Sequence, residues 1–256
     1  MSGSRSPLLP SAHYTIAEDS DSLEYVLRKS TISYSLTFGY SLLCAHFNVI
    51  KATLQPASQI PTSIDMRVRR DAHMPSHVLA VYDIPESEWG PAYQPLLVPI
   101  RVDIFTRDFR SNIIPPSPPG STFPVPHCVQ HTVGQVVTLP VIPLLVPHAP
   151  SIPLLLLFGL GLDTRSHLLC CHLLPPEVIG EFPAHTTMAN LMATLCSDDQ
   201  LRQHYKFNRG LWKNILALGP QDSKFIGLVQ TALNVTVEAR RIRKCSQACT
   251  IPPLPK

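Results

Sequence analysis

One stretch decides the fold: DDQLRQHYKFNRGLWKNILALGP, residues 198–220. Its apolar side chains recur at helical spacing, and the two aspartates at its start suit the positive end of a helix dipole. Gly219-Pro220 ends the helix, because glycine adopts the left-handed conformation and proline cannot continue the helix. Gly210 is the position at which the helix would split. The sequence therefore predicts a long amphipathic helix here.

Amphipathic patterns flank this stretch on both sides. The preceding stripe, at i, i+3, i+4 and i+7, is Met188, Leu191, Met192 and Leu195. After the stretch, Asp222 caps a last helix, which we expect to end at the basic run 240–244, where cations complement the helix dipole. The apolar residues expected to be buried together between the last two helices are Trp212, Ile215, Leu216, Phe225 and Val229. Residues 154–245 are thus predicted to be helical, followed by a tail at 246–256.

Proline punctuates the middle of the chain. Of the 27 prolines, 18 lie between Pro56 and Pro153, so almost every helical window there is broken. The segments rich in Val, Ile and Leu that predict strands are 78–82, 96–105 and 133–141. We expect the prolines at strand ends, where their missing N–H removes the fewest hydrogen bonds between strands. The sequence therefore predicts an α+β protein, in which a proline-rich, β-containing part at 23–153 packs with the helical C-terminal part, as one domain or two.

The N-terminal part joins a polar tail to an apolar segment. Residues 1–22 are polar, with an acidic run, and predict a mobile tail. From Thr31 to Ile50, β-branched and aromatic residues alternate with others, which favours a strand. Residues 42–50 fit a helix equally well.

The most apolar stretch, residues 139–162, does not predict a membrane span. Five prolines interrupt it, and only Leu154 to Leu162 is uninterrupted, which suits a buried helix. The N-terminus lacks the apolar core of a secretory signal. The seven cysteines, an odd number at irregular spacing, indicate reduced thiols. We therefore expect a cytoplasmic or nuclear protein with no membrane contact.

A group of histidines and cysteines is the most metal-like feature. The candidate ligands are His167, Cys170, Cys171 and His172, with Cys128 and His131 as a second pair. Zinc takes four such ligands, usually as two separated pairs. The alternative is that these cysteines and the neighbouring leucines belong to the core, since cysteine is among the most buried residue types. We favour the core interpretation and expect neither a metal nor another cofactor.

Two segments are candidates for contact with a partner. The basic residues are Arg240, Arg241, Arg243 and Lys244. No aromatic residue is interleaved with them, so we do not expect nucleic-acid binding and favour a solvated helix end. The loop from Ile114 to Pro126 carries no charge and contains Phe123 and Val125. This composition favours a protein contact, because charges are depleted at interface centres. A plain connection between strands is the alternative.

Two aspartates raise the alternative of a degenerate nucleotidyltransferase. In minimal enzymes of this class, two aspartates on one strand and a third on a later strand hold the catalytic metal. Here Asp65 and Asp103 would be two of the three, and Ser63 stands where the first is required. A two-metal mechanism should therefore fail. We expect Asp103 to pair with Arg101 or Arg107 instead.

From about residue 78 to 244 the chain resembles proteins related to the clampless protein of mushroom-forming fungi, a regulator of clamp-cell formation in sexual development. The segments that carry the resemblance are PIRVDIF (99–105), LPVIP (139–143), IPLLLLFGLG (152–161), LWKNILALG (211–219) and NVTVEARR (234–241). The resemblance implies a developmental role without catalysis, and it carries no catalytic residue across.

These observations favour a non-catalytic intracellular interaction or regulatory protein with a protein partner. The degenerate nucleotidyltransferase and a zinc-dependent binding module are the alternatives. No P-loop, nucleophile elbow, zinc-protease or kinase signature occurs in the sequence.

Overall fold

The computed structural model describes the residues 31–53, 60–69, 73–84, 94–115, 123–129 and 134–249. The predicted tail at 1–22 lies outside them. The prediction of an α+β fold is confirmed, because the described chain combines a mixed sheet, confined to its first part, with helices that make up nearly all of its second part. Among the described residues, no helix is both long and apolar enough to cross a membrane.

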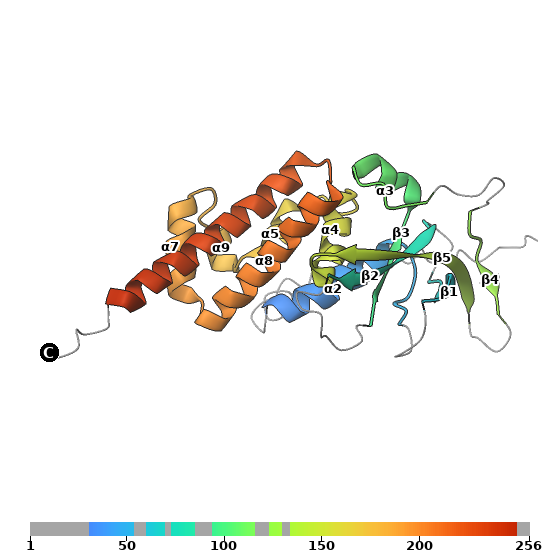
Figure 1. Cartoon of the computed structure of the whole chain (residues 1–256), viewed down its shortest axis with the longest axis horizontal. Coiled ribbons are helices and arrows are strands. Elements are labelled where there is room, and N and C mark those ends of the chain that lie inside the picture. Colours follow the sequence, from blue (N-terminus) through green and yellow to red (C-terminus); the bar gives the residue numbers. More distant parts are fainter. Residues whose placement is uncertain are drawn as a thin grey trace, which may run out of the picture. The chain divides into compact units, whose positions relative to one another are not determined.

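The sheet has the order β1-β5-β2-β3, and β4 also pairs with β5 (Figure 1). Its strands are β1 (Ser63–Arg67), β2 (His77–Asp83), β3 (Leu96–Ile100), β4 (His127–Cys128) and β5 (Gln135–Val146). β2 runs parallel to β5, and the other pairs are antiparallel. The predicted strand at 78–82 is therefore confirmed, and β5 is longer than the predicted strand at 133–141.

β5 changes partners at a proline inside the strand. Its first half pairs with β1 up to Pro140, and its second half pairs with β2 from Val141 onwards. The prediction that prolines lie only at strand ends is thus wrong. Pro140 is tolerated because it is the last residue of one ladder and precedes the first residue of the next, where a missing N–H costs little.

The segment predicted to alternate as a strand from Thr31 is instead the helix α2 (Thr31–His46). From residue 38 onwards, where its side chains are described, the buried ones are Tyr40, Leu43 and Cys44, followed by Phe47 just beyond the helix. These positions follow i, i+3, i+4 and i+7, which is the helical period. Packing of that face outweighs the strand preference of the β-branched and aromatic residues. The strand prediction here was wrong, and the helical alternative for residues 42–50 was nearer.

The segment predicted as a strand at 96–105 divides into β3 and the helix α3 (Val102–Asp108). In α3 only Phe105 is buried, and its ring stacks on that of Phe109 with centroids 4.6 Å apart. The other residues of α3 are half-buried or exposed. Buried and exposed side chains therefore do not alternate along this segment, as they would in a strand with one buried face. The Ser76 hydroxyl accepts a hydrogen bond from the Val102 N–H at 2.9 Å and marks the change of structure.

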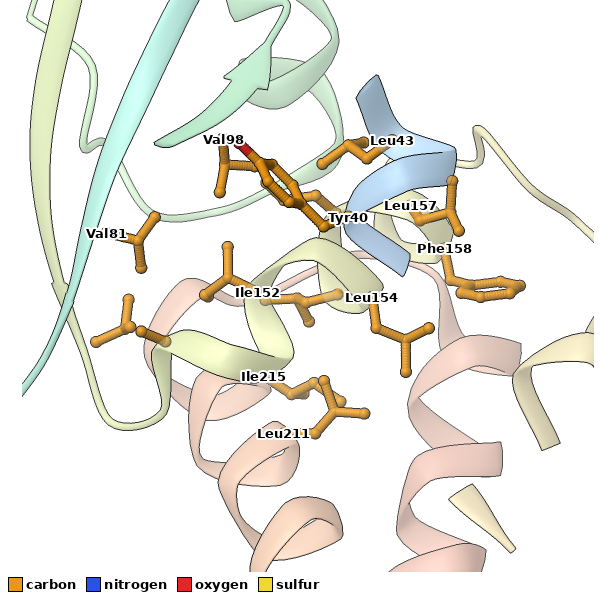
Figure 2. Close-up of a cluster of buried hydrophobic side chains, with 14 of the residues drawn as sticks. Tyr40, Leu43, Val81, Val98, Ile152, Leu154, Leu157, Phe158, Leu211 and Ile215 are labelled. Carbon is orange, nitrogen blue, oxygen red and sulfur yellow. The ribbon is translucent and has the colours of Figure 1, made fainter. Parts of the chain in front are cut away.

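The helix α4 (Ile152–Gly159) forms the centre of the core. All eight of its residues are buried, which agrees with the prediction of a buried helix in this stretch. Figure 2 shows α4 between Tyr40 and Leu43 of α2 and the sheet on one side and α8 on the other. A helix that is apolar on every face is stable only when protein surrounds it.

The remaining helices follow α4 and build the second part of the chain. They are the short η1 (Ala149–Ser151) just before α4, and then α5 (Ser166–Leu173), α6 (Pro176–Ile179), α7 (His185–Leu195), α8 (Asp198–Leu218) and α9 (Ser223–Cys249). The helix α9 packs along both α7 and α8 (Figure 1). In α7, Met188 and Met192 are buried as predicted, whereas Leu195 is 51% exposed.

The predicted ends of α8 are confirmed, and its middle is not split. Ser197 and Gln200 form a capping box, and Gly219 ends the helix in the left-handed conformation at φ 65°. At Gly210 the helix continues, because glycine leaves room there for the ring of His148: a Cβ at 210 would lie 2.6 Å from His148 Nδ1. Asp222 accepts from the backbone N–H groups of Lys224 and Phe225, as expected of the cap of α9.

Two predictions about α8 and α9 were wrong. Leu216 is 68% exposed, so it does not join the buried Ile215, Phe225 and Val229, and Trp212 is only half-buried. The helix α9 also continues past residue 245 to Cys249, because no proline or glycine stops it before then.

We expect the protein to lose stability as the pH falls from about 6.5 to about 4. Burial lowers the pKa of His172 to about 4, and it also lowers the pKa values of His148 and His204. In this window the unfolded chain binds protons that the folded chain does not, so stability rises with pH and is fully present above the unfolded pKa. His172 alone accounts for about 3 kcal/mol at pH 4.

Urea titrations at several pH values measure this change. His172→Gln should reduce the slope of stability against pH in this window. An unchanged slope in the variant would show that His172 is not responsible.

Candidate functional site

The strongest candidate for a contact site is the extended segment Phe123–Cys128, called here the apolar segment. Phe123 is 72% exposed and Val125 is 73% exposed, the highest values among the large apolar side chains of the described residues. They alternate with the half-buried Pro124 and Pro126. The exposed side chains therefore lie on one side of an extended backbone, two residues apart.

Local sequence keeps the apolar segment extended. Each proline fixes its own φ and disfavours the helical conformation for the residue before it. The end of the segment is β4, in which His127 and Cys128 pair with Val136 and Gln135 of β5. The sheet thus anchors one end of the apolar segment, and its apolar side chains face solvent without a charged residue among them.

The four cations of the predicted basic run have different surroundings. Arg243 donates to the carbonyl oxygens of Ala193 and Cys196 and to Asp198, so it holds the end of α7 against α9. Arg241 forms an ion pair with Glu238 at 2.6 Å. The prediction that this run is a helix end was wrong, because it lies inside α9. Lys244 is exposed on the same helix, and the half-buried Arg240 lies over the ring of Tyr205.

Sequence reasoning missed a second set of cations, on α8. They are Arg202, Lys206, Arg209 and Lys213. Three or four residues separate each from the next, so they form no run in the sequence, but they share one face of a helix. The signal that would have found them is the lack of any Asp or Glu between Gln200 and Gln221.

Two of the candidate zinc ligands on α5, Cys171 and His172, are core residues, whereas Cys170 is half-buried and His167 is exposed. Cys171 is buried, with its Sγ 3.6 Å from His167 Nε2, and His172 lies with its ring centroid 5.3 Å from that of Phe38. Burial raises the pKa values of the Cys170 and Cys171 thiols, whereas zinc binds the thiolate.

The second predicted pair is divided between described and undescribed residues. Cys128 is exposed on β4, and His131 lies outside the described residues. Within the described part of the chain, no three His, Cys, Asp or Glu side chains form a group able to hold a metal ion. The six cysteines whose side chains the structure describes are free thiols.

The two aspartates of the nucleotidyltransferase alternative are separated. Asp65 lies on β1 and accepts a hydrogen bond from Thr138 Oγ1 at 2.6 Å, whereas Asp103 lies on α3, which follows β3. β1 and β3 are the first and last strands in the order β1-β5-β2-β3. As predicted, Asp103 pairs with Arg101, whose Nε lies 3.1 Å from Asp103 Oδ1, and this contact lowers the Asp103 pKa.

Comparison with models of known families, with characterised proteins and with solved structures finds no match to this chain. The resemblance to the clampless-related fungal proteins therefore stays a prediction.

Proposed function

We propose that this is a non-catalytic regulatory protein of the cytoplasm or nucleus that acts by binding a protein partner through the apolar segment. The observation that supports the proposal most strongly is the exposure of Phe123 and Val125 side by side on an anchored, uncharged backbone. Exposed apolar groups of this kind are characteristic of contact surfaces. The role in fungal sexual development, in clamp-cell formation, belongs to the same proposal and rests on the sequence resemblance.

The physical basis of the binding is burial of two apolar side chains at little entropic cost. Full burial of a phenylalanine or a valine contributes roughly 1.5–3 kcal/mol. Prolines on both sides of Val125 restrict the free backbone before binding, so less conformational freedom is lost on docking. The fitting partner surface is an apolar groove that accepts side chains two residues apart along an extended strand.

Replacing Phe123 and Val125 together by serine should strongly weaken partner binding while leaving the fold intact. We expect partner affinity to fall about 100-fold, because on the order of 3 kcal/mol of burial is lost. The measurement is affinity capture of the full chain from the native cell, with quantification of each partner.

The matched control is the double variant Ile84→Ser/Leu145→Ser, which removes two other exposed apolar side chains, one just after β2 and one on β5. It should retain the partners. Equal retention by both double variants would contradict the proposal, and thermal unfolding of each variant verifies that it is folded.

A further inference from the structure

A second candidate surface lies on α8 and is positively charged. It is distant from the apolar segment in sequence and shares no residue with it. Arg202, Lys206, Arg209 and Lys213 recur at i, i+4, i+7 and i+11, which places them along one face of the helix. The row extends over about 16 Å at 1.5 Å per residue. Arg202, Lys206 and Arg209 are exposed, and Lys213 is half-buried.

The helix α9 adds a further cation to this row. The Arg240 guanidinium lies 4.1 Å from the ring centroid of Tyr205, and the Arg209 guanidinium lies 5.9 Å from the same centroid. Tyr205 therefore holds two planar cations near each other on neighbouring helices. A guanidinium held in this way is positioned to bind a carboxylate through two parallel hydrogen bonds.

The negative charges near the row leave much of it without an ion pair. Arg202 pairs with Asp199 at 3.2 Å, and Arg241 pairs with Glu238. Within the described chain, no carboxylate lies within ion-pair distance of Lys206, Arg209 or Arg240. Several close cations without counter-charges repel one another, and a partner that brings negative charge relieves this repulsion.

An exposed leucine indicates which kind of partner fits. Leu216 is 68% exposed and lies seven residues after Arg209, on the same line of the helix as Arg209 and Arg202. A nucleic-acid backbone is charged and would not bury this leucine. The Tyr205 ring, on which a base would stack, already lies against Arg240. A protein segment with acidic residues beside an apolar anchor uses both features.

We infer that the basic face of α8 and α9, defined by Arg202, Lys206, Arg209, Arg240 and Leu216, binds an acidic amphipathic segment of a protein partner. Carboxylates at i and i+4 on a partner helix have the spacing of the cations on α8. The inference goes beyond the apolar segment and does not depend on it. It also gives a function to Arg240, the one cation of the basic run that rests on an aromatic ring.

The test measures binding of the full chain to a synthetic helical peptide with Glu at i and i+4 and Leu on one edge. The comparison peptide has Gln at every Glu position. Wild-type protein should bind the Glu peptide, with an affinity that falls as salt rises, and should bind the Gln peptide at least about tenfold more weakly.

The decisive variant is Lys206→Gln/Arg209→Gln/Arg240→Gln, which should lose about tenfold or more in affinity for the Glu peptide. Its control is Lys51→Gln/Arg69→Gln/Lys224→Gln, which removes the same charge from exposed positions elsewhere and should bind like wild type. Leu216→Ser should also weaken binding.

Three outcomes would overturn the inference: equal binding by the two triple variants, equal binding of the Glu and Gln peptides, or tighter binding of a single-stranded 12-nucleotide probe that is lost in the first triple variant. The Phe123→Ser/Val125→Ser variant should bind the Glu peptide normally. That arm distinguishes failure at the basic face from failure at the apolar segment.

Discussion

Asn214→Ala is expected to lower the free energy of unfolding by about 3 kcal/mol. The Asn214 side chain is fully buried and joins α8 to the turn that precedes α4. Its Oδ1 accepts from the His148 N–H at 3.2 Å, and its Nδ2 donates to the His148 carbonyl at 2.6 Å and to Ser151 Oγ at 2.9 Å. Alanine would leave these buried polar groups without partners, and that is more costly than the loss of the hydrogen bonds alone.

Urea denaturation measures this difference, and Asn190→Ala is the control. Asn190 is exposed on α7, so the same substitution there should change stability by less than about 0.5 kcal/mol. Similar small losses in both variants would show that the connection between α8 and the turn is not important for stability.

Leu154→Ala should cost about 3 kcal/mol or more. Leu154 is 2% exposed on α4, and Figure 2 shows it in the cluster formed by α2, the sheet, α4 and α8. Truncation there removes apolar contacts from the centre of the core and leaves a cavity, because helices on several sides prevent the gap from closing.

The control is Leu145→Ala, at a residue of β5 that is 67% exposed. It should change stability by less than about 0.5 kcal/mol. A loss below about 1 kcal/mol for Leu154→Ala would contradict the assignment of α4 as the centre of the core.

The parts of the fold that sequence predicted well are those with local signals. The helix α8 has a capping pattern at its start and Gly219 at its end, and both act within a few residues of the chain. Its uninterrupted course through Gly210 was not predictable, because the reason is the ring of His148, which is distant in sequence. Tertiary contacts of this kind decide whether a glycine breaks a helix or makes room for a neighbour.

The strand predictions failed where short apolar runs fit both the two-residue period of a strand and the 3.6-residue period of a helix. Tyr40 belongs both to the alternating pattern of residues 32–40 and to the helical stripe of α2, and only packing distinguishes the two. In β5, Pro140 is compatible with a strand because the strand exchanges neighbours there. A sequence pattern does not contain that information.

The candidate contact residues likewise divide into those that the sequence predicted and those that it did not. The exposure of Phe123 and Val125 followed from an uncharged, proline-rich composition. The basic face did not, because Arg240 approaches Tyr205 only after α9 has folded back along α8. Arg243, one of the candidate contact residues, is engaged instead with the end of α7.

The most direct test of the proposed function is photo-crosslinking in the native cell, with a photoreactive phenylalanine analogue in place of Phe123 and, in a second experiment, in place of Leu145. Both positions are highly exposed, so nonspecific reaction should be similar at the two. We expect a discrete covalent adduct with a partner protein from position 123 and none from position 145. The same adducts from both positions, or no adduct from position 123, would contradict binding through the apolar segment.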